Sequence, residues 1–362
     1  MSDWTKNRLT NLLGIEYPIF QGPFGRGGST PLLAATVSNG GGLGAFGAND
    51  LDAADILKVG KEIKSRTNKP FAMNLWVSTF DRGGDSLEKE TYDLVVETLR
   101  PFYKELGIEP PAMPSGKAKD FESQVEAVLN IRPAVFSFVF GIPSKEILNE
   151  CKRLGIITAG AAATVDEAVA IEEAGVDVVV ASGFEAGGHR PFFLRPAEES
   201  LVGTIALIPQ VVDKVKIPVI AAGGIADGRG VAAALILGAS AVQIGTAFLA
   251  CDESGASDEH RKLLFQEEAK YTGLSRAYTG RLARGLYNRF AKELEPFESK
   301  FAKYPAHSWI VAPLKAAAIA QGRNDLVALW AGQAAPLVKY HKAADLLEAL
   351  VKETSVQLSA SD

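Results

Sequence analysis

Short apolar runs alternate along the chain with amphipathic stretches, and this alternation predicts strands and helices in turn. Runs of about four to eight apolar and β-branched residues bounded by Gly or Pro are typical of buried strands. Eight such runs occur, at residues 17–21, 41–46, 71–75, 134–140, 156–160, 177–182, 218–222 and 241–245. Most are almost wholly apolar, as expected of parallel strands that are covered on both faces.

Helical patterns lie between these runs, most clearly at residues 144–154, 165–174, 205–215 and 230–237. Thr164 and Asp227 stand where helix N-caps belong, and Gly155, Gly175 and Gly238 stand where helices end. The fifth and sixth strand starts are 177 − 156 = 21 residues apart. This spacing predicts consecutive strand–helix units with short loops.

Eight strands alternating with helices by about residue 245 predict a (β/α)₈ TIM barrel. A doubly wound open sheet is the alternative, because periodicity alone does not show whether a sheet closes. We prefer the barrel because the strand count stops at eight and glycines cluster at the strand ends. We expect the barrel at 11–255, a helical insertion at 77–133 after the third strand, a mostly helical subdomain at 256–353 on the barrel mouth, and a frayed tail at 354–362.

The helical stretches expected outside the barrel repeat lie at 87–106, 121–131, 259–270, 286–294, 309–321, 325–330 and 343–353. The first two belong to the insertion, which is too long for a bare loop.

Composition and charge exclude several classes of protein. The 362 residues are 47% hydrophobic and 22% charged, which is a globular composition, and 43 acidic against 38 basic residues argue against a nucleic-acid partner. Cys151 and Cys251 are too few for a disulfide framework or a cysteine zinc site, and no metal site is predicted. No run reaches the ~18 apolar residues of a membrane span, and the N-terminus has no apolar signal segment. We therefore expect a cytoplasmic protein without a membrane partner.

Two glycine-rich loops predict a phosphate site. Active sites of such barrels lie at the carboxyl ends of the strands. Gly223 and Gly224 follow the seventh predicted strand and open a helix, and Gly245 and Thr246 follow the eighth. Amide groups in such loops can face an anion, and a helix N-terminus adds its positive dipole end. The plainer interpretation is that the glycines only allow a tight turn.

His189 is the candidate catalytic residue. It is the only histidine of four in a glycine-rich loop at a strand end, within residues 183–190. An imidazole titrates near pH 6.5 and can act as a general base at neutral pH. The alternative is a loop histidine bonded to a neighbour. His260, His307 and His341 are predicted to be surface or packing residues.

Other patterns are weak. Four arginines form a basic stretch: Arg276, Arg281, Arg284 and Arg289. We expect a solvated, ion-paired face there, with a role near a ligand phosphate as the alternative. A GxGxxG pattern at Gly42, Gly44 and Gly47 follows a predicted helix rather than a strand, so it is a poor dinucleotide fingerprint.

Several motifs resemble, in family order, those of the nitronate monooxygenases, formerly called 2-nitropropane dioxygenases. They are YPIFQGPFG, MNLW, ASGFEAGGHR, PVIAAGGIADGRG with VQIGTAFL, GRLARGLYNRF and LWAGQ, and the similarity runs from about residue 11 to 351. The resemblance implies an FMN-bound barrel that oxidises alkyl nitronates with dioxygen to a carbonyl compound and nitrite, with propionate 3-nitronate as one candidate substrate. We expect a monomer or weak homo-oligomer.

The resemblance also implies roles for individual residues. The implied cofactor-binding residues are Gly22, Pro23, Phe24, Asn74, Ser182, Gly187, Gly188, Gly223, Gly224, Gln243, Ile244, Gly245, Thr246, Trp330, Gly332 and Gln333. Those at 22–24 would lie against the flavin ring, Asn74 would hydrogen-bond the cofactor, and Gly187 would support it. The phosphate would be held by Gly224, Gln243, Gly245 and Thr246. The motif that would close over the ring contains Trp330, Gly332 and Gln333. Ser182 stands where many members carry Gln, and Pro191 stands where a glycine often follows the His–Arg pair.

The remaining alternatives concern chemistry. Flavin-dependent enoyl-acyl-carrier-protein reductases and NAD(P)H:quinone reductases share this scaffold, and a barrel that binds a phosphosugar or flavin without catalysis is a third possibility. His189 would orient the nitronate anion if protonated, or remove the α-proton of a neutral nitroalkane if neutral.

Overall fold

The computed structural model describes residues 3–77 and 83–359 and contains a barrel of eight parallel strands. These strands are β1 (Ile19–Gln21), β2 (Gly44–Gly47), β3 (Phe71–Trp76), β4 (Val135–Val139), β5 (Ile157–Ala162), β6 (Val178–Ser182), β8 (Val219–Ala222) and β9 (Ala241–Ile244). They pair in the order β1-β9-β8-β6-β5-β4-β3-β2. Leu43 joins the ends, because its N–H donates to the Ile19 carbonyl and its carbonyl accepts from the Gln21 N–H, both at 2.9 Å. The sheet therefore closes nearly completely, which confirms the predicted barrel over the open sheet.

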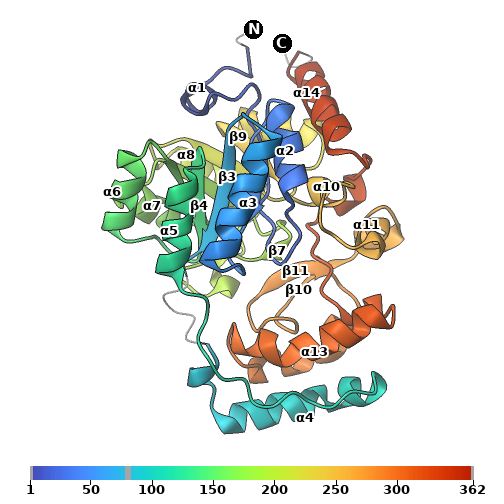
Figure 1. The fold of residues 1–362 in the computed structure, drawn as a ribbon. Coiled ribbons are helices and arrows are strands. Elements are labelled where there is room, and N and C mark those ends of the chain that lie inside the picture. The colour runs from blue at the N-terminus through green and yellow to red at the C-terminus, as the bar shows by residue number, and fades with distance from the viewer. Residues whose placement is uncertain (1–2, 78–82, 360–362) are drawn as a thin grey trace.

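Helices cover the outside of the barrel (Figure 1). They are α2 (Pro31–Asn39), α3 (Ala53–Arg66), α5 (Phe121–Ile131), α6 (Lys145–Arg153), α7 (Val165–Glu173), α8 (Thr204–Val212), α9 (Gly228–Ile236), the single turn α10 (Thr246–Leu249) and α14 (Ala343–Ser359). Thr164 and Asp227 cap α7 and α9 as predicted. The barrel interior is apolar, and Leu9 and Leu13 of α1 (Arg8–Leu13) pack into it.

A second body, the cap, lies beside the barrel and is drawn below it in Figure 1. Its elements are η1 (Gly84–Ser86), α4 (Lys89–Glu105), β7 (Gly188–His189), η2 (Ala197–Ser200), α11 (Asp258–Leu264), η3 (Glu267–Lys270), β10 (Thr272–Ser275), β11 (Ala283–Leu286), α12 (Arg289–Leu294), η4 (Glu295–Lys300), α13 (Ala306–Ala320), η5 (Asn324–Leu326) and η6 (Ala335–Leu337). Leu99 and Phe102 of α4 share an apolar core with Phe290 and Leu314. The insertion is thus divided, because α4 belongs to the cap while α5 covers the barrel.

The cap departs from the helical prediction where its chain crosses the barrel mouth. Strand β11 pairs antiparallel with both β10 and β7, so the predicted helix at 286–294 begins only at Arg289, after the Asn288 N-cap. The predicted helix at 325–330 is only the short η5, and Trp330 instead bridges to Gly285. The pairing of β11 with β7 explains the later helix start, because it holds residues 283–286 extended beside the loop that follows β6.

The C-terminal segment also differs from prediction. Helix α14 continues to Ser359, so residues 354–359 are helical rather than frayed, and residues 360–362 lie outside the described part. Thr354 is fully buried, and Glu353 Oε2 accepts from the Gly228 N–H of α9 at 2.9 Å. This helix therefore packs on the barrel and not on its mouth.

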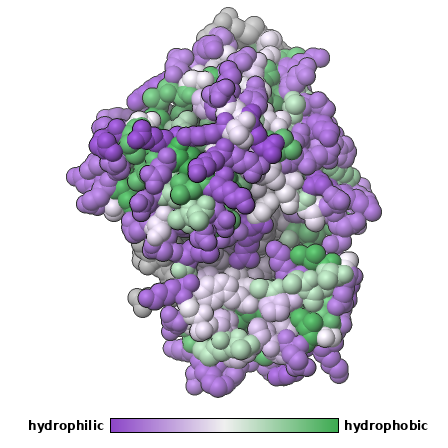
Figure 2. Space-filling view, viewed as in Figure 1, coloured by the Kyte–Doolittle hydropathy of each residue, from purple (hydrophilic) through white to green (hydrophobic). Residues whose placement is uncertain are grey.

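Hydrophilic side chains cover much of the face seen in Figure 2 and are interrupted by smaller apolar areas. Among the described residues, no helix combines the length and apolar character needed to cross a membrane.

Candidate functional site

A cavity of about 1170 Å³ opens at the carboxyl ends of the strands and is lined by residues of both barrel and cap. Ligand pockets commonly measure about 300–1,000 Å³, so this one has room for a cofactor together with a small substrate. The implied site residues that line it are Gly22, Pro23, Phe24, Asn74, Ser182, Gly187, Gly188, His189, Gly223, Gly224, Gln243, Gly245, Thr246, Trp330 and Gly332. The structure thus brings together segments that are far apart in the sequence, from Gly22 to Gly332.

Two of the implied residues do not line this cavity. Ile244 is fully buried on the outer side of the strand, within the apolar layer beneath the helices, and only its carbonyl faces the β1 loop, where it accepts from the Gly22 N–H at 2.8 Å. Gln333 is exposed, and its N–H donates to the Glu185 carbonyl at 2.9 Å. The Ile244 side chain therefore packs beneath the helices, and Gln333 holds the loop through its backbone N–H.

The two glycine loops present unused amide groups. Gly223 and Gly224 have φ values of 99° and 72°, a conformation that glycine adopts without strain. In the described part of the chain, the backbone N–H groups of Gly223, Gly224, Gly245 and Thr246 donate no hydrogen bond. Such unpaired donors on adjacent loops suit an anion such as a phosphate.

Helix α9 contributes less to this anion site than its sequence suggests. Asp227 caps the helix, and its Oδ1 accepts from the N–H groups of Arg229 and Gly230 at 3.1 and 3.3 Å. The first amides of α9 are therefore already bonded to a carboxylate. The donors that remain lie in the glycine turn and at the start of α10.

The backbone of the loop after β6 lies in close contact with the backbone of the segment that follows Trp330. A Cβ atom on Gly187 would lie 2.6 Å from the Gly332 nitrogen, and one on Gly332 would lie 2.8 Å from the Glu185 oxygen. The Gly332 N–H also donates to Thr246 Oγ1 at 2.9 Å. Glycine is required at both positions, and the contacts hold Trp330 over the cavity.

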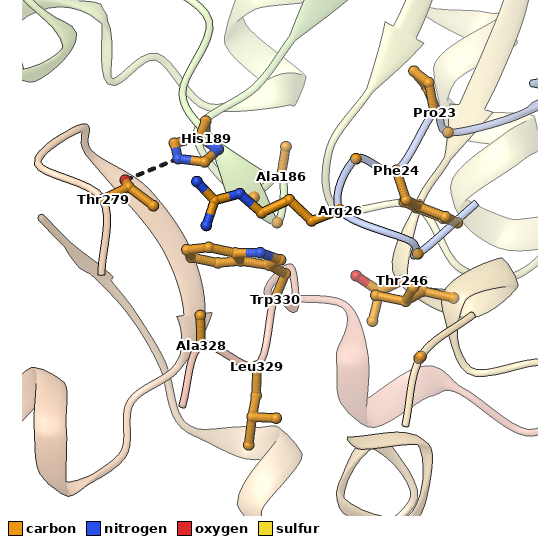
Figure 3. Close-up of a pocket in the computed structure, with 18 of the residues that line it drawn as sticks. Pro23, Phe24, Arg26, Ala186, His189, Thr246, Thr279, Ala328, Leu329 and Trp330 are labelled. Carbon is orange, nitrogen blue, oxygen red and sulfur yellow. Dashed lines mark hydrogen bonds between the residues drawn. The ribbon is translucent and has the colours of Figure 1, made fainter. Parts of the chain in front are cut away.

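His189 lies in an aromatic wall of the cavity, opposite Pro23 and Phe24 (Figure 3). Its ring centroid is 5.0 Å from that of Trp76 and 5.3 Å from that of Trp330. Burial lowers the pKa of His189 well below its usual range, and the positive charges of Arg281 and Arg26 lower it further. The imidazole is therefore neutral at neutral pH.

Hydrogen bonding at Thr279 assigns the tautomer of this neutral ring. His189 Nε2 lies 2.9 Å from Thr279 Oγ1. That hydroxyl donates its one proton to the Arg281 carbonyl at 3.1 Å and accepts from the Arg281 N–H at 3.3 Å. It can therefore only accept from His189, which places the ring proton on Nε2. Nδ1 then carries the lone pair, and it has no hydrogen-bond partner within the described residues.

The basic stretch of the cap divides into two groups. Arg276 pairs with Glu198, and Arg289 pairs with Glu105 and Glu293, as predicted for an ion-paired face. Arg281 instead lies 4.0 Å from the centroid of the Phe140 ring at the cavity wall, and Arg284 is buried, with Nε donating to the Phe184 carbonyl at 3.0 Å. The prediction of a solvated, ion-paired face is therefore wrong for Arg284, because β11 lies against the loop after β6.

Arg190 holds the loop that carries His189. Its guanidinium is buried and donates to the carbonyl groups of Gly183, Ser182 and Ser200 at 2.6, 3.0 and 3.2 Å. Burial lowers the pKa of Arg190 to about 10, so the side chain stays charged at neutral pH.

The other histidines pack as predicted. His260 Nε2 lies 3.0 Å from the Trp330 carbonyl oxygen, and His307 Nε2 lies 2.9 Å from that of Ala277. Burial lowers the pKa of each to about 4. His341 stacks on Phe265 with ring centroids 4.0 Å apart.

Sequence reasoning missed Thr279, Arg26 and Lys315, which also line the cavity. Arg26 carried a visible signal, because it is the one charged residue in the glycine-rich loop after the first strand. Thr279 carried none, since it is 90 residues from His189 in the sequence.

Comparison with known proteins identifies the family. The family model described as nitronate monooxygenase matches residues 6–353. The chain belongs to this family. A probable nitronate monooxygenase of Staphylococcus aureus strain Newman is 38% identical over 351 residues, which cover 97% of this chain and 98% of the relative. The predicted family is thereby confirmed, and the chain is an oxidoreductase of a family that acts on small molecules.

Solved structures agree with the fold. The structure of a nitroalkane oxidase from Streptomyces ansochromogenes is similar with a TM-score of 0.90 and 35% identity, covering 98% of this chain and all of that one. FabK from Thermotoga maritima is similar with a TM-score of 0.76 and 29% identity, covering 98% of each chain. An enoyl reductase domain of MlnA from Bacillus amyloliquefaciens, at 14% identity and a TM-score of 0.64, shares the fold alone.

Proposed function

We propose that this chain binds FMN in the cavity and oxidises alkyl nitronates with dioxygen to a carbonyl compound and nitrite, with propionate 3-nitronate among the candidate substrates. The observation that carries this proposal is the neutral His189, whose Nδ1 has no hydrogen-bond partner within the described residues. Its side chain lines the cavity that also holds the unbonded amide groups of the two glycine loops.

The residues present fit FMN. The four free amide groups of Gly223, Gly224, Gly245 and Thr246 match one terminal phosphate, and the remaining cavity extends past Phe24 to the aromatic wall. Asn74 would hydrogen-bond the cofactor from the end of β3, and Gln243 would help to hold the phosphate. Ser182 would make its contact through a shorter side chain than the glutamine of other members. FMN, when bound, supplies the electron-accepting chemistry that no side chain provides.

His189 has a defined task in this scheme. The neutral Nδ1 accepts the α-proton of a neutral nitroalkane, and Thr279 keeps Nε2 protonated so that the lone pair stays on Nδ1. The rings of Trp76 and Trp330 pack beside the imidazole. Because its lowered pKa keeps the ring neutral, His189 can accept a proton but cannot hold an anion by charge. This favours proton removal over the orienting role of a cationic imidazole.

The decisive experiment combines spectroscopy and product analysis. We expect the purified protein to be yellow, to release FMN on denaturation, and to form nitrite from nitronates with oxygen consumption. Recovery of FAD, or no flavin after reconstitution, would contradict the cofactor assignment. Anaerobic mixing with NADH tests the alternative, because rapid flavin bleaching would indicate an enoyl or quinone reductase instead.

A variant separates base catalysis from binding. His189→Asn keeps a polar side chain that cannot exchange a proton near neutral pH. We expect turnover of neutral nitroalkanes to fall by about 10² or more, the scale of general base catalysis, while preformed nitronates lose less. An equal loss on both substrates would mean that His189 only positions the anion.

A further inference from the structure

Gly224 offers its N–H to the proposed phosphate site only if the peptide plane before it is turned the right way. The bond between Gly223 and Gly224 is trans, because the one cis peptide bond in the described part of the chain is Tyr304–Pro305. In a trans peptide, the C=O and the N–H that follows it point in opposite directions. Both residues are glycines at positive φ, and glycine adopts many backbone conformations, so the glycines alone do not fix this plane.

Thr204, the first residue of α8, fixes the direction of the plane. Its Oγ1 lies 2.9 Å from the Gly223 carbonyl oxygen. That carbonyl therefore points toward α8, and the Gly224 N–H points the other way and donates no hydrogen bond within the described residues. The hydroxyl has its place because residue 183 is glycine, where a Cβ atom would collide with Thr204 Oγ1.

The single proton of the Thr204 hydroxyl has one acceptor without another donor. Oγ1 lies 2.9 Å from Glu185 Oε2 and from the Gly223 carbonyl oxygen, and 3.4 Å from that of Ala222. Ala222 already accepts from the Gly183 N–H at 2.8 Å, and the Glu185 carboxylate accepts from the Thr204 N–H at 2.9 Å. Within the described residues, only Thr204 donates to the Gly223 carbonyl. Because a hydroxyl holds one proton, it belongs in the bond to Gly223.

Glu185 holds Thr204 in place. Both of its carboxylate oxygens lie 2.9 Å from the Thr204 nitrogen at the start of α8, where the helix dipole favours a negative charge. The Glu185 carbonyl accepts from the Gln333 N–H at 2.9 Å, which fixes the backbone of the same residue. The loop after β6 therefore anchors the hydroxyl that turns the glycine peptide after β8.

We propose that Thr204 is a positioning residue for the cofactor phosphate, because its hydroxyl turns the Gly223–Gly224 peptide so that the Gly224 N–H faces the phosphate. The inference rests on the proposed function, since FMN supplies that phosphate. Thr204 does not line the cavity, whereas Gly224 does, so Thr204 acts through the peptide and not by contact with the ligand. Without the hydroxyl, the peptide is free to turn over and present a carbonyl oxygen, which repels a phosphate.

Binding of FMN and of riboflavin separates this role from support of the fold, since riboflavin lacks the phosphate. Both flavins are titrated into the full chain after its flavin has been removed, and the dissociation constants follow from the flavin fluorescence. We expect Thr204→Val to weaken FMN binding about tenfold and to leave riboflavin within about twofold of the parent, because one hydrogen bond to a charged phosphate is lost. Thr204→Ser keeps the hydroxyl and should bind both flavins like the parent.

Thr158→Val is the matched control. Thr158 is buried, and its Oγ1 and N–H donate to Asp177 Oδ2 at 2.7 and 2.8 Å, so it makes the same pair of bonds to a carboxylate as Thr204. It stands near the start of β5, at the opposite end of the strands from the cavity. This variant should unfold at lower urea concentration and still bind FMN like the parent. If Thr204→Val does not fold, Thr204→Ala replaces it, because alanine places no methyl group against the Glu185 carboxylate.

A second readout uses the FMN-loaded protein. The phosphorus-31 resonance of bound FMN should shift in Thr204→Val and keep its position in Thr158→Val. An FMN dissociation constant unchanged in Thr204→Val would overturn the inference and leave the proposed function standing. Equal weakening of FMN and riboflavin would also overturn it, because Thr204 would then support the fold and not the phosphate. A parent that binds no FMN would contradict the proposed function and this inference together.

Discussion

Thr279→Val is the sharpest perturbation of the proposed base, because it removes the acceptor of the His189 ring proton and changes almost no volume. The same substitution also removes the two hydrogen bonds of this hydroxyl with the Arg281 backbone. Thr279 is 1% exposed and its Oγ1 is the acceptor for His189 Nε2 at 2.9 Å. With valine, the ring must either bury an N–H without an acceptor or move its proton to Nδ1. A buried donor left unpaired costs about 1–3 kcal/mol. At about 1.4 kcal/mol per factor of ten, the reactive tautomer loses about 5- to 150-fold.

The assay compares kcat/KM for neutral nitroethane with that for ethyl nitronate, each by oxygen consumption at neutral pH. We expect Thr279→Val to lower the value for nitroethane within the range above and to spare ethyl nitronate, which has already lost its proton. Thr279→Ser keeps the hydroxyl and should restore most of the rate. No loss on nitroethane would show that this hydrogen bond does not set the tautomer, and equal losses would refute the assignment of His189 as the base.

Two further predictions concern the phosphate cradle and the buried histidines. Gly245 has an ordinary φ of −96°, and a Cβ atom there would meet only Phe24, at 3.8 Å, so Gly245→Ala should fold and bind FMN. Gly245→Asp should raise the FMN dissociation constant at least about tenfold, because its carboxylate repels the phosphate. Equal dissociation constants for the two variants would refute the phosphate site at the glycine loops. His260 and His307 have pKa values of about 4 in the folded protein, below the ordinary value of about 6.5, so the unfolded chain binds more protons between these pH values. The stability that these neutral histidines contribute is fully present above about pH 6.5 and is lost as the pH falls toward 4. At pH 5 each histidine lowers the free energy of unfolding by about 2 kcal/mol relative to neutral pH. A urea midpoint unchanged between pH 7 and pH 5 would contradict this.

The barrel could be predicted because its information is local. Each strand is a short apolar run, and caps such as Thr164 and Asp227 mark where helices begin, so the order of elements follows from neighbours in sequence. The glycine turn at Gly223 and Gly224 was equally visible, since its position after a strand and its residue type together imply exposed amides. Asp227, however, accepts hydrogen bonds from the first amide groups of α9. The sequence shows that Asp227 can cap the helix, but it does not show which backbone N–H groups remain without an acceptor.

The cap could not be predicted to the same extent, because its order depends on contacts between distant segments. The helix predicted at 286–294 begins only at Arg289, because Leu286 ends β11, whose Ala283 pairs with His189 of β7. Trp330 leaves its predicted helix for a bridge to Gly285. Thr279 has no local signal at all, since its role comes from that same pairing.

The surroundings of His189 make its basicity depend on what the cavity holds. In the empty site, burial and the charges of Arg281 and Arg26 keep the pKa of His189 well below its usual range, which makes it a weak base. As a nitroalkane loses its proton, a nitronate forms beside these same cations, and its negative charge offsets them and stabilises the imidazolium. This stabilisation acts only after the proton has moved, because the complex with a neutral nitroalkane adds no negative charge, and the pKa of His189 stays depressed there. For neutral nitroalkanes we therefore expect kcat/KM, which reports the free enzyme, and kcat, which reports the complex, both to stay level between pH 6 and 8. Measuring both on the parent and on Arg26→Gln tests this reasoning. Removing one cation should raise the free-enzyme pKa and bring the acid limb of kcat/KM toward neutral pH, and a profile identical to the parent's would show that Arg26 does not act on His189.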